Sequence, residues 1–230
     1  LCFTEHSDYD VPTVVNCDYD AYFKEMEEMK EKYKGQITLK TGIEFGIQVH
    51  TTKAYEETFG QYPFDFVIFS CHQVENKEYW RQEPQKGKTQ LEYNRRYYQE
   101  ILDVVKAYKD YSILGHLDVI KRYDLNGEIE LEKIKDLIEQ IFEVVIADGK
   151  GIELNTSSRA YHLKSLMPSR EILELYHDMG GKIITIGSDA HNADRVGDRV
   201  MESQKILKEI GFNGIYTFDQ MKPKFHEFKF

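Results

Sequence analysis

The chain has 230 residues, of which 41% are hydrophobic and 30% charged, and its formal net charge is −10. This length and composition predict one soluble globular domain over residues 1–230, and no apolar run is long enough to make a membrane the partner. The acidic balance disfavours nucleic acid as a partner, although a small anionic substrate could still bind beside metal ions. The three cysteines form no CxxC pair, so we expect a reducing, cytoplasmic location.

Apolar, β-branched runs alternate along the chain with longer segments of helical period. Seven runs are predicted strands: Leu1–Thr4, Ile37–Ile43, Phe64–Ser70, Tyr111–Leu114, Gly151–Leu154, Lys182–Ile186 and Gly214–Phe218. The first predicted helix lies between Asp18 or Asp20, which can cap its start, and Gly35, which can end it. Apolar stripes at helical spacing predict further helices over residues 98–108, 131–145, 172–179 and 200–210.

Repeated strand–helix units are typical of an α/β fold, because parallel strands need crossover connections that usually contain a helix. Seven strands could form either an open doubly wound sheet or a closed barrel. The segment Gln73–Lys88 is polar and long for a connection, which suits a loop that covers a site. We expect Trp80 of this loop to contact a substrate, so that Trp80→Ala should raise KM.

Potential metal ligands stand at or beside the ends of five predicted strands. They are His6, Glu44, His72, His116, Asp189 and His191. Because the C-terminal ends of parallel strands meet at one mouth of a barrel, these side chains should converge in space. One histidine at a strand end is more often structural, but four imidazoles and two carboxylates at corresponding ends indicate a metal site.

Imidazole nitrogens mixed with carboxylate oxygens suit Zn, Mn or Fe better than Ca or Mg. Six side chains exceed the needs of one tetrahedral ion, so we expect two or more ions. Glu44 is the best candidate for a bridging ligand because its carboxylate has two oxygens.

Two arginines follow strands whose ends reach the same mouth. Guanidinium groups bind phosphate oxygens in pairs, so Arg159 or Arg195 could hold a substrate phosphate, although either could equally form a loop or surface ion pair. Among the remaining histidines, only His162 is placed to border the site, and a structural role is more common for such a residue.

The ordered series Thr-Glu-His, Gly-Ile-Glu, Ser-Cys-His, Gly-His-Leu-Asp and Gly-Ser-Asp-Ala-His resembles the PHP (polymerase and histidinol phosphatase) superfamily. Within it, the chain looks most like the monofunctional histidinol-phosphate phosphatases. The resemblance implies a distorted (β/α)7, TIM-like barrel with a trinuclear site of Zn, Mn or Fe. It also implies that Glu44, His72 and His116 hold one ion, with Glu44 bridging to a second ion bound by Asp189. His6 and His191 would then serve the third ion.

The chain departs from this family at its start. Members carry a His-x-His pair on their opening strand, and nothing before Leu1 supplies that pair here. Because Leu1 also falls inside a predicted strand, we expect that the natural protein has an N-terminal strand ahead of this residue.

The resemblance implies a phosphatase of histidine biosynthesis that converts L-histidinol phosphate to L-histidinol and phosphate. A metal-activated hydroxide would attack phosphorus, with Arg159 and His191 in catalysis and Arg159 or Arg195 on the phosphate. Two alternatives stay open. One is a PHP-type phosphoesterase that acts on nucleotides or other small phosphate esters, and the other is a metal-binding regulatory domain without catalysis.

Overall fold

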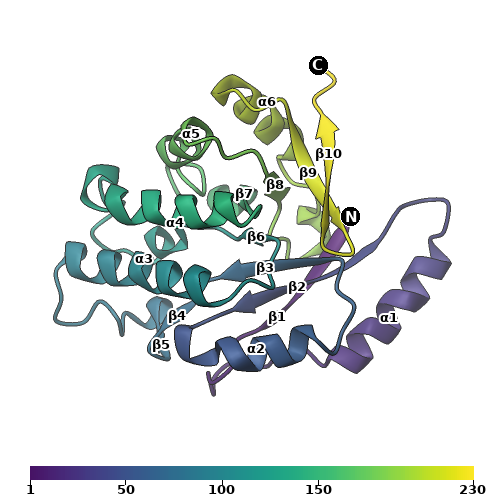
Figure 1. Ribbon diagram of the computed structural model, residues 1–230, viewed down its shortest axis with the longest axis horizontal. Coiled ribbons are helices and arrows are strands. Elements are labelled where there is room, and N and C mark those ends of the chain that lie inside the picture. Colours follow the sequence, from purple (N-terminus) through teal and green to yellow (C-terminus); the bar gives the residue numbers. More distant parts are fainter.

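The computed structural model describes all of residues 1–230 and contains a curled sheet of six parallel strands with helices along its outer side (Figure 1). Every pairing within this sheet is parallel. All the C-terminal strand ends therefore lie at one mouth of the curl. The strands, in their order across the sheet, are β1 (Cys2–Ser7), β2 (Lys40–Gly46), β3 (Phe66–Ser70), β6 (Ile113–Leu114), β7 (Gly151–Asn155) and β8 (Ile184–Gly187).

Six α-helices connect or follow these strands: α1 (Tyr19–Lys32), α2 (Thr52–Phe59), α3 (Gln90–Ala107), α4 (Lys135–Ala147), α5 (Arg170–Asp178) and α6 (Val200–Ile210). The predicted cap at Asp18 is confirmed, because its side chain accepts a hydrogen bond from the backbone N–H of Ala21. Helix α3 begins with a reciprocal cap between Thr89 and Glu92. None of the helices is both long and apolar enough to span a lipid bilayer.

Short 3₁₀ turns follow several strands and carry residues of the mouth. They are η1 (Val49–Thr51), η2 (Tyr79–Arg81), η3 (Val119–Arg122), η4 (Leu131–Lys133), η5 (Thr156–Arg159) and η6 (Ala193–Arg195). The polar loop that begins at Gln73 contains η2 and a small hairpin of β4 (Gln73–Val74) and β5 (Lys77–Glu78).

Strand alternation separates the core from the site. Ile43 and Phe45 of β2 are fully buried in a cluster of 38 apolar residues that includes side chains of the surrounding helices. Glu44 lies between them, so its side chain points to the opposite, inner face of the curl. The same alternation puts Ile152 and Leu154 of β7 in the core and Glu153 on the inner face.

The sheet has six strands and does not close into the seven-stranded barrel that the family resemblance implies. The seventh predicted strand forms as β9 (Gly214–Asp219), but it pairs antiparallel with β10 (Lys222–Glu227) in a separate hairpin. Gln220 and Met221, both with positive φ, turn the chain directly back at the end of β9, so the neighbouring strand is β10.

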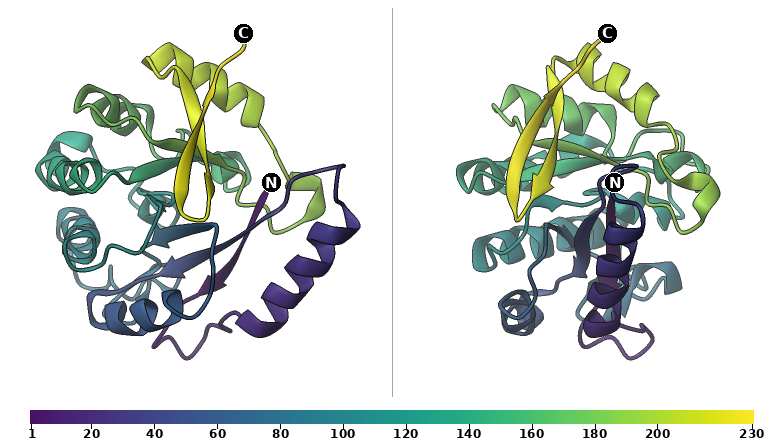
Figure 2. Two further views of the ribbon diagram at one scale, coloured as in Figure 1. Left: turned by 45° about the vertical axis from the view of Figure 1, so that its right-hand side comes forward. Right: turned by 90° about the vertical axis from the view of Figure 1, so that its right-hand side faces the viewer.

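This hairpin packs into the end of the curl that faces away from the mouth (Figure 2). Phe218 contacts Ile68 and Ile113 in a second apolar cluster, and the backbone N–H of Gln220 donates to Asp65 Oδ1 over 3.2 Å. The hairpin therefore covers part of the end of the curl where the strands begin, opposite the mouth.

Candidate metal centre

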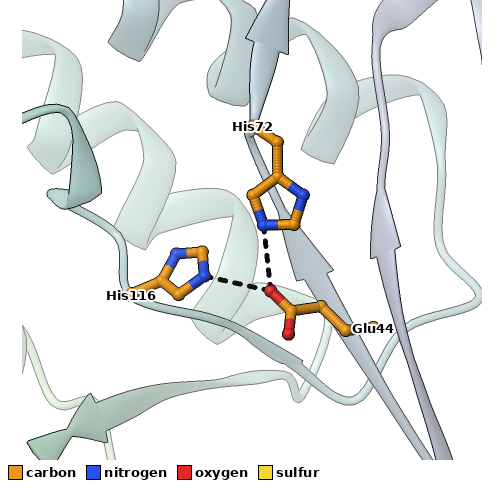
Figure 3. A group of neighbouring side chains, drawn as sticks. All are labelled: Glu44, His72 and His116. Carbon is orange, nitrogen blue, oxygen red and sulfur yellow. Dashed lines mark hydrogen bonds and ion pairs between the residues drawn. The ribbon is translucent and has the colours of Figure 1, made fainter. Parts of the chain in front are cut away.

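Three histidines surround one glutamate at the mouth. Glu44 Oε1 lies 3.0 Å from Nε2 of His72 and 3.0 Å from Nε2 of His116 (Figure 3). Its other oxygen, Oε2, lies 3.1 Å from Nε2 of His6. One donor atom from each of Glu44, His72 and His116 falls within 4.8 Å of the others, which is close enough for all three to reach one cation.

The remaining predicted ligands, Asp189 and His191, lie beside this cluster. The imidazole rings of His6 and His191 have centroids 5.7 Å apart, and His191 Nδ1 lies 3.5 Å from Asp189 Oδ1. Asp189 itself has a φ of 48°, so the chain turns sharply directly after β8. This turn brings two residues that are two apart in sequence to the same mouth. The structure thus gathers all six predicted ligands.

The donor set fits a transition metal. Glu44 is buried and meets three imidazole Nε2 atoms, and no lysine or arginine forms an ion pair with it. His116 Nδ1 is buried without a partner, so its ring is held only through the nitrogen that faces Glu44. Two or more imidazoles and a carboxylate around one point are the donors that Zn, Mn and Fe prefer.

Protons occupy the centre when no ion does. Burial opposes ionisation of Glu44, but the neighbouring His6, His116 and His72 hold the pKa of this carboxyl well below its usual value. Burial also opposes the imidazolium of His72, yet the Asp8 and Glu44 carboxylates raise the pKa of His72 well above the ordinary range. Glu44 raises the pKa of His6 in the same way. A cation that binds here must therefore displace protons, which is the usual coupling of metal affinity to pH.

Asp8, which the sequence reasoning missed, orients His72 from the side opposite Glu44. Asp8 Oδ1 lies 2.7 Å from His72 Nδ1, and Asp8 is buried. An ionised carboxylate accepts hydrogen bonds only, so Nδ1 carries a proton, and Nε2 is the nitrogen that a cation would meet after displacing the second ring proton. The contact depends on Gly46, because a Cβ atom there would lie 1.9 Å from Asp8 Oδ1.

A cavity of about 290 Å³ opens beside the centre. His6, His72, His116, Asp189 and His191 form its polar wall. Aromatic side chains form much of the remaining wall, namely Tyr79, Trp80, Tyr123 and Tyr161. A second and larger hollow of about 560 Å³ lies between β1 and β8 and also reaches His6, Glu44, Asp189 and His191. The centre is thus accessible to a molecule with a polar head and a flat apolar part.

The two predicted phosphate-binding arginines lie outside both cavities. Arg159 is exposed, and Arg195 donates only a long, 3.4 Å bond to the backbone oxygen of Ser188. Their roles stay predictions. His162 is exposed and also lines neither cavity.

Arg122 is the arginine that the structure brings to the centre. Its Nη2 donates to Ser157 Oγ over 2.9 Å and to Asp189 Oδ2 over 3.3 Å, and its guanidinium lies 3.5 Å from the ring centroid of Tyr161. Its hydrogen bonds all use Nη2, so Nη1 is left as a donor for another group. One sequence signal could have indicated this residue: Arg122 ends the short turn η3 that follows His116, so it starts from the same strand end.

A curled parallel sheet with a histidine–carboxylate cluster at the C-terminal strand ends defines a metal-binding α/β protein. Residues 1–157 match the family model described as PHP domain, and the chain belongs to this family. It is 30% identical over 227 residues to the histidinol-phosphatase of Lactococcus lactis subsp. lactis, an alignment that covers 96% of this chain and 84% of that protein. A protein of Thermotoga maritima named "Probable histidinol-phosphatase" is 28% identical over 213 residues, covering 92% of this chain and 79% of the relative.

A solved structure shares the fold. The histidinol phosphate phosphatase of Lactococcus lactis, in complex with zinc, L-histidinol and phosphate, superposes with a TM-score of 0.87 and 29% identity, covering 97% of this chain and 86% of that one. The curled six-stranded sheet is therefore a family architecture.

Proposed function

We propose that the chain is a metal-dependent phosphomonoesterase that hydrolyses L-histidinol phosphate to L-histidinol and phosphate. The observation that carries this proposal is the cluster in which Glu44 meets three histidines at the mouth of the sheet. Similarity to a histidinol-phosphatase over 96% of the chain supports the choice of substrate. The structure of that relative with zinc, L-histidinol and phosphate supports a metal-assisted reaction.

Two or three ions of Zn, Mn or Fe would be held by His6, Glu44, His72, His116, Asp189 and His191. Glu44 would bridge two of them, because its two oxygens face different histidines. Such ions, when bound, acidify water and neutralise charge on phosphoryl oxygens.

The chain's own residues would bind and orient the phosphate ester. Arg122 is best placed for the phosphate, because its guanidinium is buried in the cavity wall, stacked on Tyr161, and has a donor to spare. Arg159 and Arg195 are proposed for the same task if their loops move inward. His191 is exposed at the mouth and can hold a proton for the departing alcohol oxygen.

The setting of the enzyme is part of the proposal. Residues 1–230 would act as one domain, and the curled sheet would be an arc of the distorted (β/α)7 barrel of the family. The unpaired cysteines support a cytoplasmic location, and the net charge of −10 supports a small-molecule substrate over nucleic acid.

Phosphate release from L-histidinol phosphate, a nucleoside monophosphate and an aryl phosphate, each with added Zn, Mn or Fe, tests the function. We expect the highest kcat/KM on histidinol phosphate. Glu44→Gln should lower kcat/KM at least a hundredfold, about 3 kcal/mol, since it removes a charge that the ions need. Arg122→Gln should lower it roughly tenfold to a hundredfold, because hydrogen bonds to charged groups contribute about 1.5–3 kcal/mol.

His50→Ala is the matched control, because His50 is an exposed histidine that pairs with Asp10 outside the site. Its activity should equal that of the unchanged protein. Hydrolysis confined to nucleotides would reject the substrate, and a protein that binds no transition metal would reject the enzyme class altogether.

A further inference from the structure

Strand β7 contributes no predicted metal ligand, although its neighbours β6 and β8 both lead into one. Its inward-facing residues Glu153 and Asn155, with Ser157 of the following turn η5, are nonetheless all buried and polar. Buried polar groups need partners, so the destination of their hydrogen bonds is informative.

Those hydrogen bonds form one continuous hydrogen-bond chain across the mouth, from His116 to Asp189. The backbone N–H of His116 donates to Glu153 Oε2 over 3.1 Å, and Asn155 Nδ2 donates to the same oxygen over 3.1 Å. Asn155 Oδ1 in turn accepts from the backbone N–H of Ser157 over 2.9 Å, and the Ser157 hydroxyl oxygen lies 2.6 Å from the same Oδ1. The Ser157 oxygen lies 3.0 Å from Asp189 Oδ2.

The backbone N–H of Ser157 fixes the orientation of the Asn155 side-chain amide. Because the Ser157 N–H points at Asn155, the side-chain atom facing it must be the amide oxygen, so the NH₂ group faces Glu153. Asn155 Oδ1 is already satisfied by that N–H, which leaves the Ser157 hydroxyl proton able to serve Asp189. Ser157 Oγ also accepts from Arg122, so the hydroxyl is held from two sides.

The backbone leaves room for this arrangement at one position only. Gly187 of β8 lies opposite Asn155 in the strand pairing, and a Cβ atom on Gly187 would fall 1.9 Å from Glu153 Oε1. The Glu153 carboxylate therefore sits directly over the β8 backbone, two residues before Asp189.

We propose that Glu153, Asn155 and Ser157 are positioning residues that fix the main chain at His116 and the carboxylate of Asp189 relative to each other. Under the proposed function, on which this inference rests, His116 and Asp189 serve different ions. The hydrogen-bond chain through Glu153, Asn155 and Ser157 then sets the separation between those ions. The three residues act through geometry and touch no ion themselves.

Zinc affinity, measured by competition with a chelator in the absence of substrate, tests this role. Glu153→Ala and Ser157→Ala should each weaken zinc binding tenfold to a hundredfold, the usual loss when a group that orients a metal ligand is removed. Glu153→Gln should stay within threefold of the unchanged protein, because its amide oxygen can accept both bonds. The double variant Glu153→Ala/Ser157→Ala should lose less than the product of the single losses, because both changes break the same chain.

Thr185→Val is the matched control. Thr185 pairs with Glu153 in the adjacent strand and lines the same hollow, but its side chain makes no hydrogen bond, so zinc affinity should not change. In enzyme assays the positioning variants should lower kcat more than they raise KM.

Equal losses of zinc affinity for Glu153→Gln and Glu153→Ala would overturn the proposal, because they would show that the site needs the negative charge of Glu153 itself. Unchanged zinc binding by Ser157→Ala, or strictly additive losses, would overturn it as well. A crystal structure of metal-free Ser157→Ala in which Asp189 keeps its place would do the same. A wrong substrate assignment leaves the zinc measurements intact, so the two failures can be told apart.

Discussion

The Asp8–His72 pair shows how one buried carboxylate prepares a histidine for a metal. Asp8 accepts a hydrogen bond from Nδ1–H of His72, so Nε2 is the nitrogen that can offer a lone pair to a metal at the centre. The same contact raises the pKa of His72 when no ion is present, against the effect of burial. Protonation and metal binding therefore compete for one nitrogen.

The competition predicts opposite pH dependences for the metal-free and zinc-bound protein. A group whose folded-state pKa is raised stabilises the fold below its ordinary pKa, near 6.5, and loses this contribution as pH rises through the folded value. Urea denaturation of chelator-treated protein should therefore show a falling free energy of unfolding as pH rises above about 6.5. Zinc affinity should rise over the same interval, because protons no longer compete.

Asp8→Asn separates these effects. It removes the charge that raises the pKa of His72, so the decline in stability of the metal-free protein above pH 6.5 should flatten, and zinc affinity should fall tenfold to a hundredfold. A variant that keeps both the wild-type pH profile and the wild-type zinc affinity would show that Asp8 does not control His72.

At the scale of elements, the loop that begins at Gln73 contributes Tyr79 and Trp80 to the aromatic wall of the cavity. Trp80 of η2 packs near Tyr123, with ring centroids 6.2 Å apart, and both residues line the cavity of the metal centre. Trp80 is partly exposed, with 43% of its surface accessible, so a bound molecule could still cover part of it. A flat aromatic wall is suited to stack with a substrate ring.

Trp80→Ala should accordingly raise KM for histidinol phosphate about tenfold and leave kcat nearly unchanged, since stacked aromatic pairs contribute about 0.5–1.5 kcal/mol beyond area burial. Steady-state kinetics on histidinol phosphate measure the effect, and a phosphate ester without an aromatic ring serves as the reference substrate. Leu125→Ala is the control, because Leu125 is an exposed apolar residue that lines neither cavity. An unchanged KM in the Trp80 variant would exclude the loop from binding.

The parallel strands were predictable because buried β-branched runs leave a strong local signal. The strand boundaries were less predictable: β2 runs from Lys40 to Gly46, so both of its ends lie three residues later in the chain than predicted. Helix α2 was missed because Tyr55 is its only buried residue, which leaves no apolar stripe to detect. The place of β9 depends on positive φ at Gln220 and Met221, residues that do not favour that conformation, so its pairing could not be read locally.

The convergence of the six candidate ligands at one mouth was predictable for a different reason. Parallel strands impose a common mouth, so chemistry at strand ends is brought together whatever the details of packing. The roles of Arg122 and Asp8, and the hydrogen-bond chain through β7, were not predictable. Their contacts depend on the path of the turns that follow the strands and on the space left by Gly46 and Gly187. Neither feature can be recognised from the type of a single residue.

At the scale of the whole molecule, metal binding should be a major source of stability. An ion that binds only the folded state stabilises it by about 2.7 kcal/mol at a hundredfold excess over Kd. For a chain of this size that corresponds to a rise in Tm of about 5–10 °C. Calorimetry with zinc and with a chelator should show this difference, and Glu44→Gln should lose most of it. If the unchanged protein had the same Tm with zinc as with a chelator, no ion would bind it.

His6 and His191 come from the first and last strands of the parallel sheet, and their rings lie 5.7 Å apart. A nascent chain therefore cannot complete the centre until β8 and the turn after it have left the ribosome and the intervening strands have paired. Ions captured earlier by Glu44, His72 and His116 would sit in a partial cage. Under the proposed function, metal would therefore be loaded late in biogenesis, after the entire sheet has assembled.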